Sequence, residues 1–245
     1  MIKLTRDPKP DFLSVEKVKE LTRKFKKDKS SVWNNDKIKK PLLNSANNKC
    51  AYCECALNIQ DSYMEVEHFE DKDNNADKVV EWDNLLPSCK RCNGSKSTHD
   101  VITTPILNPY IDEPKEHFKL KNYRVKHKTA KGYESIGVCD LNNSEKVVIV
   151  RFKIGNKLED TIENAQEKWD LYYIERTTRR KNKFINIIKS LLRKCQVDSK
   201  YSATTSTILH SSDIFNDLVE KLKDEELWDS EHQELYDDSI KLVLD

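Results

Sequence analysis

Glycine is scarce in this 245-residue chain, and its apolar stretches are short. The four glycines argue against a Gly-rich loop that cradles phosphates and against a flexible linker between domains. No segment approaches the roughly 18 consecutive apolar residues that a membrane helix needs. The first ten residues, MIKLTRDPKP, lack the apolar core of a signal peptide. We therefore expect a soluble cytoplasmic protein.

Net charge is also nearly absent, at +1, but this total hides a strong segregation of charge along the chain. Residues 1–50 and 101–200 each have a net charge of +8, whereas residues 51–100 have −6 and residues 201–245 have −9. Such segregation is more informative about partners than the total. The basic segments are candidates for contact with nucleic-acid phosphates, and solvated helix faces are the alternative.

Helical periodicity dominates the apolar pattern outside the middle of the chain. It predicts helices over residues 14–28, 145–175, 179–195 and 213–224, with Ser14 as the cap of the first. A shorter helix is expected over residues 36–46, interrupted by Pro41. Alternating apolar and charged residues predict a hairpin within residues 117–138, with AKG as its turn.

Seven cysteines are present, and a disulfide framework is not expected in a chain without an export signal. Their spacing is informative, because Cys50-x-x-Cys53 and Cys89-x-x-Cys92 form two C-x-x-C pairs. Two such pairs provide the four thiolates of a tetrahedral structural zinc site. We predict that this zinc stabilises the segment between the pairs and takes no part in chemistry. The remaining cysteines are Cys55, Cys139 and Cys195.

Side chains suited to metal-assisted hydrolysis surround these pairs. Glu67 and His68 stand together in EVEHFEDKD. Asn84 precedes the second pair in DNLLPSC, and Asn93 follows it in CNGSK. A neutral His can act as a general base on water, and carboxylate or amide oxygens suit Mg²⁺. Each residue alone is more often structural, but their order around two C-x-x-C pairs is specific.

This arrangement resembles the HNH nucleases, whose fold is the ββα-metal finger. The three motif positions correspond to His68, Asn84 and Asn93. The commonest form of the family has His in the last position and often Asp before the catalytic His, where this chain has Asn93 and Glu67. The resemblance implies an α+β protein, in which a zinc-stapled HNH finger is embedded in a mainly helical chain with a small β-hairpin.

The resemblance also implies a role for each residue of the motif. His68 would activate water as the general base, and Asn84 would brace the loop that carries His68. Glu67 and Asn93 would ligate one catalytic Mg²⁺ or Mn²⁺. Lys96 is expected either to contact a phosphate or to pack against the motif.

A closer resemblance covers residues 1–115 and extends more weakly to about residue 175. The segments MIKLTRDPKPDF, KCAYCE, WDNLLPSCKRCNGSKSTHD and ILNPYIDEP are similar to the PtuB family, the HNH component of Septu anti-phage systems. This family is also found with some retrons. The resemblance implies a nuclease, with DNA the favoured substrate, that works with an ABC-type ATPase called PtuA. In a retron setting, a reverse transcriptase and its DNA–RNA product would join the complex.

The sequence therefore predicts three parts. Residues 1–47 form an N-terminal arm and helices, residues 48–115 form the HNH core with its zinc site, and residues 116–245 form a mainly helical region that docks a partner. Two alternatives stay open. One is an HNH enzyme directed at RNA, and the other is a non-catalytic zinc-finger adaptor that binds nucleic acid or protein.

Overall fold

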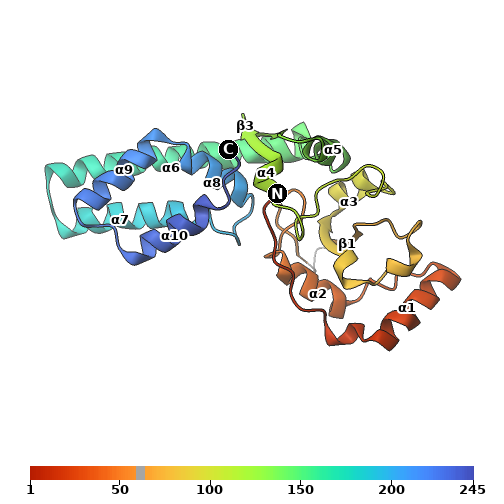
Figure 1. The fold of residues 1–245 in the computed structure, drawn as a ribbon. Coiled ribbons are helices and arrows are strands. Elements are labelled where there is room, and N and C mark those ends of the chain that lie inside the picture. The colour runs from red at the N-terminus through yellow and green to blue at the C-terminus, as the bar shows by residue number, and fades with distance from the viewer. Residues whose placement is uncertain (59–63) are drawn as a thin grey trace. The chain divides into compact units, whose positions relative to one another are not determined.

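Two units make up the computed structural model, which describes residues 1–58 and 64–245. The first unit comprises Met1–Phe118 with Val125–Asn143, and the second comprises Lys119–Arg124 with Ser144–Asp245 (Figure 1). No described helix is long and apolar enough to cross a membrane. The described part of the chain is mainly helical, with two small antiparallel strand pairs.

The first unit begins with two helices, α1 (Val15–Asp28) and α2 (Asp36–Ser45), after a 3-10 turn at Asp11–Leu13. The Ser14 hydroxyl accepts a backbone hydrogen bond and caps α1, which confirms the prediction. The predicted interruption at Pro41 was wrong, because α2 continues through this residue. Burial of Ile38, Leu42 and Leu43 on one side of α2 offsets the hydrogen bond that proline cannot donate.

An antiparallel strand pair followed by a helix forms the centre of the first unit. Strand β1 spans Met64–His68, strand β2 spans Leu85–Cys89, and helix α3 spans Lys90–Lys96. Met64 pairs with Cys89 and His68 pairs with Leu85, so the strands match over their whole length. Cys89 also caps α3, since its sulfur accepts the Cys92 backbone N–H at 3.5 Å. Short 3-10 turns at Ala76–Lys78 and Trp82–Asn84 lie between the strands.

A second hairpin follows the short helix α4 (Pro114–His117) and pairs β3 (Phe118–Lys121) with β4 (Arg124–His127), as predicted. Its turn is not AKG, and that prediction was wrong. The chain reverses at Asn122 and Tyr123, whose φ values of 50° and 61° suit a tight hairpin turn. AKG instead begins helix α5 (Ala130–Val138), because the Thr129 hydroxyl accepts the Gly132 N–H at 3.1 Å and caps it.

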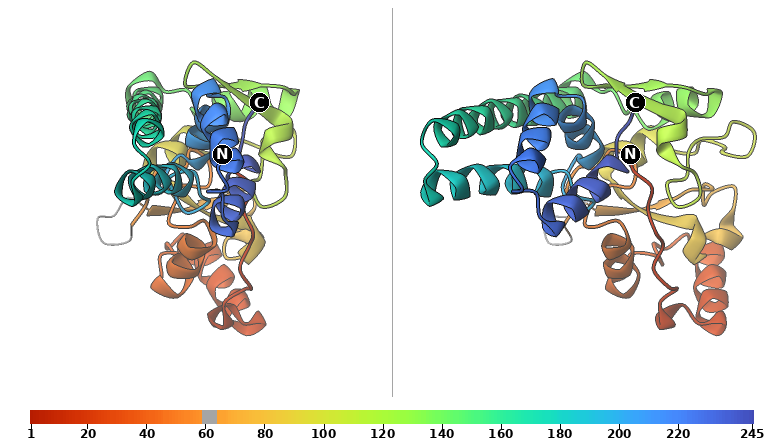
Figure 2. Two further views of the ribbon diagram at one scale, coloured as in Figure 1. Left: turned by 90° about the vertical axis from the view of Figure 1, so that its left-hand side faces the viewer. Right: turned by 60° about the vertical axis from the view of Figure 1, so that its left-hand side comes forward.

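Five helices form most of the second unit, among the residues that the structure describes. They are α6 (Ile149–Ile174), α7 (Thr178–Arg193), α8 (Ser202–His210), α9 (Asp213–Asp224) and α10 (Ser230–Ile240), and a π-helical turn at Ser144–Val148 precedes α6. Helix α6 packs along α7, and α8 and α9 also contact α6 (Figure 2). Their apolar faces share one core, which includes Trp169, Phe184, Leu191, Phe215 and Leu218.

The structure confirms the helices predicted over residues 145–175, 179–195 and 213–224 as α6, α7 and α9. Helices α8 and α10 were not predicted. Helix α8 is rich in Ser and Thr and lacks apolar periodicity. It is nevertheless largely buried, and its Ser206 hydroxyl donates to the Cys195 carbonyl at 3.0 Å. Tertiary packing therefore overrides local propensity in α8.

Candidate functional site

Four thiols gather in the first unit. The sulfurs of Cys50, Cys53, Cys55 and Cys89 all lie within 4.8 Å of one another. Those of Cys53 and Cys89 are 3.8 Å apart. A tetrahedral zinc with Zn–S bonds of roughly 2.3 Å places its sulfurs about 3.8 Å apart. The sulfur-only donor set therefore fits a structural zinc ion.

Three of the four predicted zinc ligands belong to this cluster, and Cys55 takes the place predicted for Cys92. Cys92 nevertheless adjoins the cluster. Interactions with the thiols of Cys50, Cys53 and Cys89 hold the pKa of the Cys92 thiol well above its ordinary value. Five thiols therefore surround a site that needs four, which the C-x-x-C spacing did not reveal.

His68 ends β1, and its ring is held in place by two neighbours. Its Nε2 lies 2.9 Å from the Val79 carbonyl oxygen. A carbonyl only accepts, so Nε2 carries the proton and Nδ1 is the basic nitrogen. The Trp33 ring lies edge-on to the imidazole, with 4.7 Å between centroids. Burial lowers the pKa of His68 to about 4, so the imidazole is neutral at pH 7, as a general base requires.

Asn84 holds the loop that follows His68. Its Oδ1 accepts the Glu70 backbone N–H at 2.7 Å, and its Nδ2 donates to the carbonyls of Glu70 and Lys78 at 3.0 and 3.2 Å. Its own carbonyl accepts the Phe69 N–H at 2.9 Å. These bonds fix the backbone directly after the imidazole.

Glu67 and Lys96 form a buried ion pair. The Lys96 Nζ lies 2.7 Å from Glu67 Oε1 and donates to the His68 carbonyl at 2.9 Å. Both residues are at most 2% exposed. Burial raises the pKa of Glu67 to about 7, although the nearby Lys96 opposes this rise. Because its ammonium is buried and engaged, Lys96 packs against the motif and presents no surface to a phosphate.

Asn93 contacts the carboxylate of Glu65, because its Nδ2 donates to Glu65 Oε2. Glu65 and Glu67 are two positions apart on β1 and so point to the same face of the strand. Glu65, His68 and Asn93 line one pocket of about 470 Å³. Its other lining residues include Ser31, Trp33, Asn34, Lys39 and Lys72.

The sequence pattern did not identify several residues that line this pocket. Strand alternation groups Glu65 with Glu67, but Glu67 does not line this pocket, so alternation alone does not identify Glu65. Nothing local marks Trp33 or Lys39, because tertiary folding brings the segment around α2 to the pocket.

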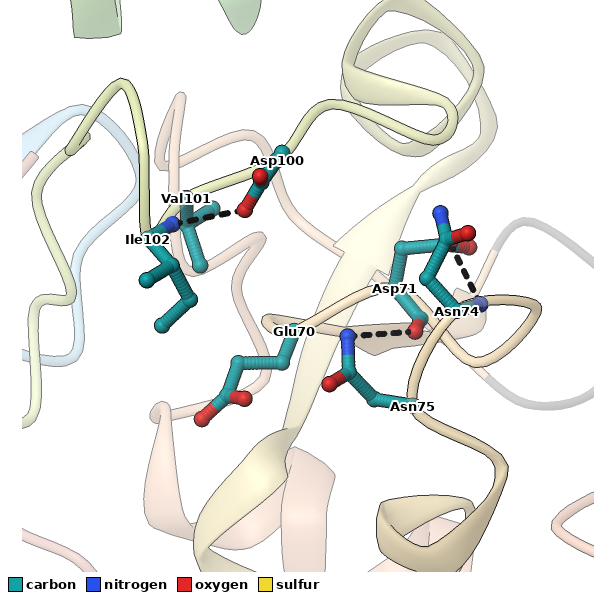
Figure 3. A pocket seen from close by; sticks show the side chains of 7 residues that line it. All are labelled: Glu70, Asp71, Asn74, Asn75, Asp100, Val101 and Ile102. Atoms are coloured by element: carbon teal, nitrogen blue, oxygen red, sulfur yellow. Dashed lines mark hydrogen bonds between the residues drawn. The ribbon is translucent and has the colours of Figure 1, made fainter.

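A second pocket, of about 400 Å³, adjoins the loop after His68 (Figure 3). It is lined by Glu70, Asp71, Asn74, Asn75, Asp100, Val101 and Ile102. Its carboxylates are engaged in bonds that shape the chain. Asp71 Oδ2 accepts the Asn74 amide at 2.7 Å, Asp100 Oδ1 accepts the Ile102 N–H at 2.9 Å, and Glu70 pairs with Lys78. These acidic groups therefore stabilise turns.

Comparison with known proteins extends the resemblance over the whole chain. No model of a protein family matches. Over 246 aligned residues the chain is 42% identical to the Septu protein PtuB of Bacillus thuringiensis. This alignment covers 100% of the chain and 95% of that protein. Over 209 residues it is 29% identical to the Septu protein PtuB of Bacillus mycoides strain KBAB4, covering 65% of this chain and 68% of that protein. The chain therefore belongs to the PtuB family of Septu proteins.

Proposed function

We propose that this chain is a metal-dependent HNH endonuclease that hydrolyses phosphodiester bonds of nucleic acid, with DNA the favoured substrate. One observation carries the proposal. The neutral, oriented imidazole of His68 lines the same pocket as the Glu65 carboxylate and the Asn93 amide. The order β1, β2 and α3 is that of a ββα-metal finger, which supports the same conclusion.

The catalytic cation, Mg²⁺ or Mn²⁺, belongs beside Asn93. Amide and carboxylate oxygens are the donors that Mg²⁺ prefers, so the groups present fit the ion. Glu67 is the ligand that the motif implies, and it must exchange the Lys96 ammonium for the cation. Glu65 already contacts Asn93 and needs no such exchange. When bound, the cation supplies positive charge to the scissile phosphate and the leaving oxygen.

The residues of the chain then act on the attacking water. His68 Nδ1 takes a proton from the water, while the Val79 carbonyl holds the Nε2 proton. The water oxygen forms its bond to phosphorus as the bond to the 3′ oxygen breaks. The leaving 3′ oxygen takes a proton from solvent, which leaves a 5′-phosphate and a 3′-hydroxyl. Asn84 keeps the loop after His68 fixed during this step.

The thiol cluster serves as a structural zinc site in this proposal. Cys50, Cys53 and Cys89 supply three of its ligands. We assign the fourth position to Cys92, which the two C-x-x-C pairs predict and which adjoins the cluster, so that Cys55, the fourth sulfur of the cluster, is a neighbouring thiol. A site closed by four thiolates leaves no position for substrate. The zinc therefore stabilises the finger without entering the reaction.

Membership of the PtuB family supports a role in Septu anti-phage defence. The nuclease would be the effector subunit of a complex with an ABC-type ATPase of the PtuA kind. Residues 116–245, which include the helices of the second unit, would dock that partner. In a retron-type complex, a reverse transcriptase and its DNA–RNA product would be further partners.

A cutting assay with the full chain, alone and with a PtuA-type ATPase, tests the nuclease proposal. With Mg²⁺ and plasmid DNA, His68→Ala should lower the rate by about 100-fold or more, because a general base contributes roughly 10²–10⁴. His127→Ala, at an exposed position on β4, should cut like wild type. Equal cutting by His68→Ala would contradict the mechanism, and cutting of RNA alone would contradict the DNA preference. Binding of nucleic acid without any cutting would favour the adaptor.

A further inference from the structure

The pocket at His68 has a second set of lining residues that the HNH motif does not contain. Ser31, Trp33 and Asn34 lie between α1 and α2, and Lys39 lies on α2. Lys72 comes from the loop after β1. The N-terminal segment, which carries a net charge of +8 over residues 1–50, thus contributes directly to the pocket of the general base.

The charges of these residues favour an anionic ligand. The pocket lining contains two ammonium groups, on Lys39 and Lys72, and one carboxylate, on Glu65. Within the described part of the chain, Lys39 has no ion-pair partner. Lys72 has a loose contact of 3.7 Å with Asp73 and keeps 32% of its side chain exposed. Partly exposed and weakly paired ammonium groups can contact phosphate oxygens.

Trp33 connects this part of the pocket to the imidazole. Its ring packs edge-on against His68 and, at 5.7 Å between centroids, against Phe25 of α1. The Lys72 ammonium lies 5.6 Å from the Trp33 ring centroid, within range of a cation–π contact. Packing of Trp33 therefore limits the rotation of the His68 ring and holds Lys72 near it.

We propose that Lys39 and Lys72 bind the backbone phosphates on either side of the scissile phosphate, and that Trp33 is a positioning residue for His68. This inference rests on the proposed nuclease function. It adds a substrate-binding wall, by which we mean the side of the pocket formed by Lys39, Lys72 and Trp33. The wall reads no bases, since ammonium groups contact phosphates without regard to sequence.

Binding measurements in a cutting-deficient background test the two lysines. The full chain with His68→Ala is titrated with a short labelled DNA strand in Mg²⁺ at several salt concentrations. Lys39→Ala combined with Lys72→Ala should raise Kd by about tenfold. It should also reduce the slope of log K against log salt by about 1–2, since each phosphate contact contributes roughly 0.7–0.9.

The matched control is Lys37→Ala combined with Lys40→Ala, which removes the same charge from α2 outside the pocket lining. It should leave both Kd and slope close to those of the parent. Equal effects of the two double variants would overturn the inference, whether or not the wild-type chain cuts. A wild-type chain that binds through Lys39 and Lys72 but never cuts would overturn the nuclease proposal and leave the binding wall intact. An RNA strand in the same titration shows which polymer the wall prefers.

Steady-state cutting tests the role of Trp33. Trp33→Ala should lower kcat by about tenfold with little change in KM, and Trp33→Phe should restore most of the rate by keeping an aromatic edge against His68. A Trp33→Ala variant that keeps wild-type kcat would overturn the positioning role. So would a Trp33→Phe variant as slow as Trp33→Ala with an unchanged melting temperature.

Discussion

The two units bury different chemistry at their centres. In the second unit, apolar faces of five described helices meet in a core that includes Leu158, Phe184, Leu191 and Leu218. Around the site in the first unit, the buried groups include thiols and the Glu67–Lys96 ion pair. Packing stabilises the second unit, whereas the proposed finger would depend on a structural metal at the cysteine cluster and on balanced charge. In the proposed nuclease, these buried polar groups would hold the structural metal and the residues around His68.

The charge segregation along the chain also has a different outcome in each unit. In the second unit, basic residues of α7 face acidic residues at the start of α10. Lys189 lies 2.7 Å from Asp229 and 2.6 Å from Glu231, and Arg193 also pairs with Glu231. The basic block before residue 200 and the acidic block after it therefore partly neutralise each other. In the first unit, Lys39 remains unpaired by any described carboxylate and lines the pocket.

The largest expected effect comes from removing the metal, which should unfold part of the first unit and leave the second unit folded. Cys53→Ser should abolish zinc binding and unfold the finger, because a structural zinc supplies much of the folding free energy of a small domain. Helices α6 to α10 should stay folded, since none of the clustered thiols lies in the second unit. Hydrogen exchange measured by mass spectrometry should show fast exchange over residues 64–96 and slow exchange over α6 and α7.

The control for this change is Cys139→Ala, a buried cysteine of the first unit outside the cluster. It should retain one zinc per chain by metal analysis. Cys92→Ala should lose zinc, and Cys55→Ala should keep it. If Cys55→Ala lost zinc and Cys92→Ala kept it, Cys55 would be the fourth ligand. In the Cys53→Ser variant, unfolding of α6 together with the finger would contradict the independence of the two units.

Breaking the buried ion pair should have the next largest effect. Lys96→Met leaves Glu67 buried without its partner and should lower the free energy of unfolding by about 3–5 kcal/mol. The double variant Glu67→Gln with Lys96→Met should recover most of this loss, because no charge then remains buried. Urea unfolding in zinc-saturated buffer measures both. A double variant as unstable as Lys96→Met would show that packing, and not charge balance, dominates here.

Acid should weaken the second unit through His210, in addition to His232, whose pKa burial also lowers. His210 lies between the rings of Phe215 and Tyr236, and its Nε2 is 2.8 Å from the Ser239 hydroxyl. Burial lowers its pKa from 6.5 to about 4. The folded state binds the proton less well than the unfolded state, so stability is full above pH 6.5 and falls as the pH drops toward 4.

Because the ring is partly exposed, this loss should reach only about 1–2 kcal/mol. His210→Gln keeps a polar group near Ser239 but cannot titrate. Its unfolding free energy should therefore change less than that of wild type between pH 7 and pH 4, by urea unfolding followed at α8 and α9. Parallel pH curves for the two proteins would refute the assignment.

Sequence pattern predicted the helices of the second unit unequally well. Periodicity sufficed for α6, α7 and α9, because one apolar stripe on each helix meets a shared core. It failed for α8, whose small hydroxyl side chains are buried by contacts distant in sequence.

The candidate site shows the same contrast between what local sequence indicates and what tertiary packing decides. The candidate residues His68, Asn84 and Asn93 were identified by their resemblance to the HNH motif, which is readable in the local sequence. The Glu67–Lys96 pair and the approach of Trp33 depend on side-chain packing, which spacing does not encode.

The smallest expected effect concerns the surface charges of the second unit. Lys189→Ala removes the contacts with Asp229 and Glu231 and should lower the free energy of unfolding by less than about 1 kcal/mol, since both carboxylates are about half exposed and such ion pairs are screened by water. The difference from wild type should shrink further at about 1 M salt, where the Debye length is about 3 Å. Urea unfolding at low and high salt measures it. A loss above about 2 kcal/mol that survives high salt would mean that paired charges stabilise both units, and the contrast between a polar finger and an apolar bundle would fail.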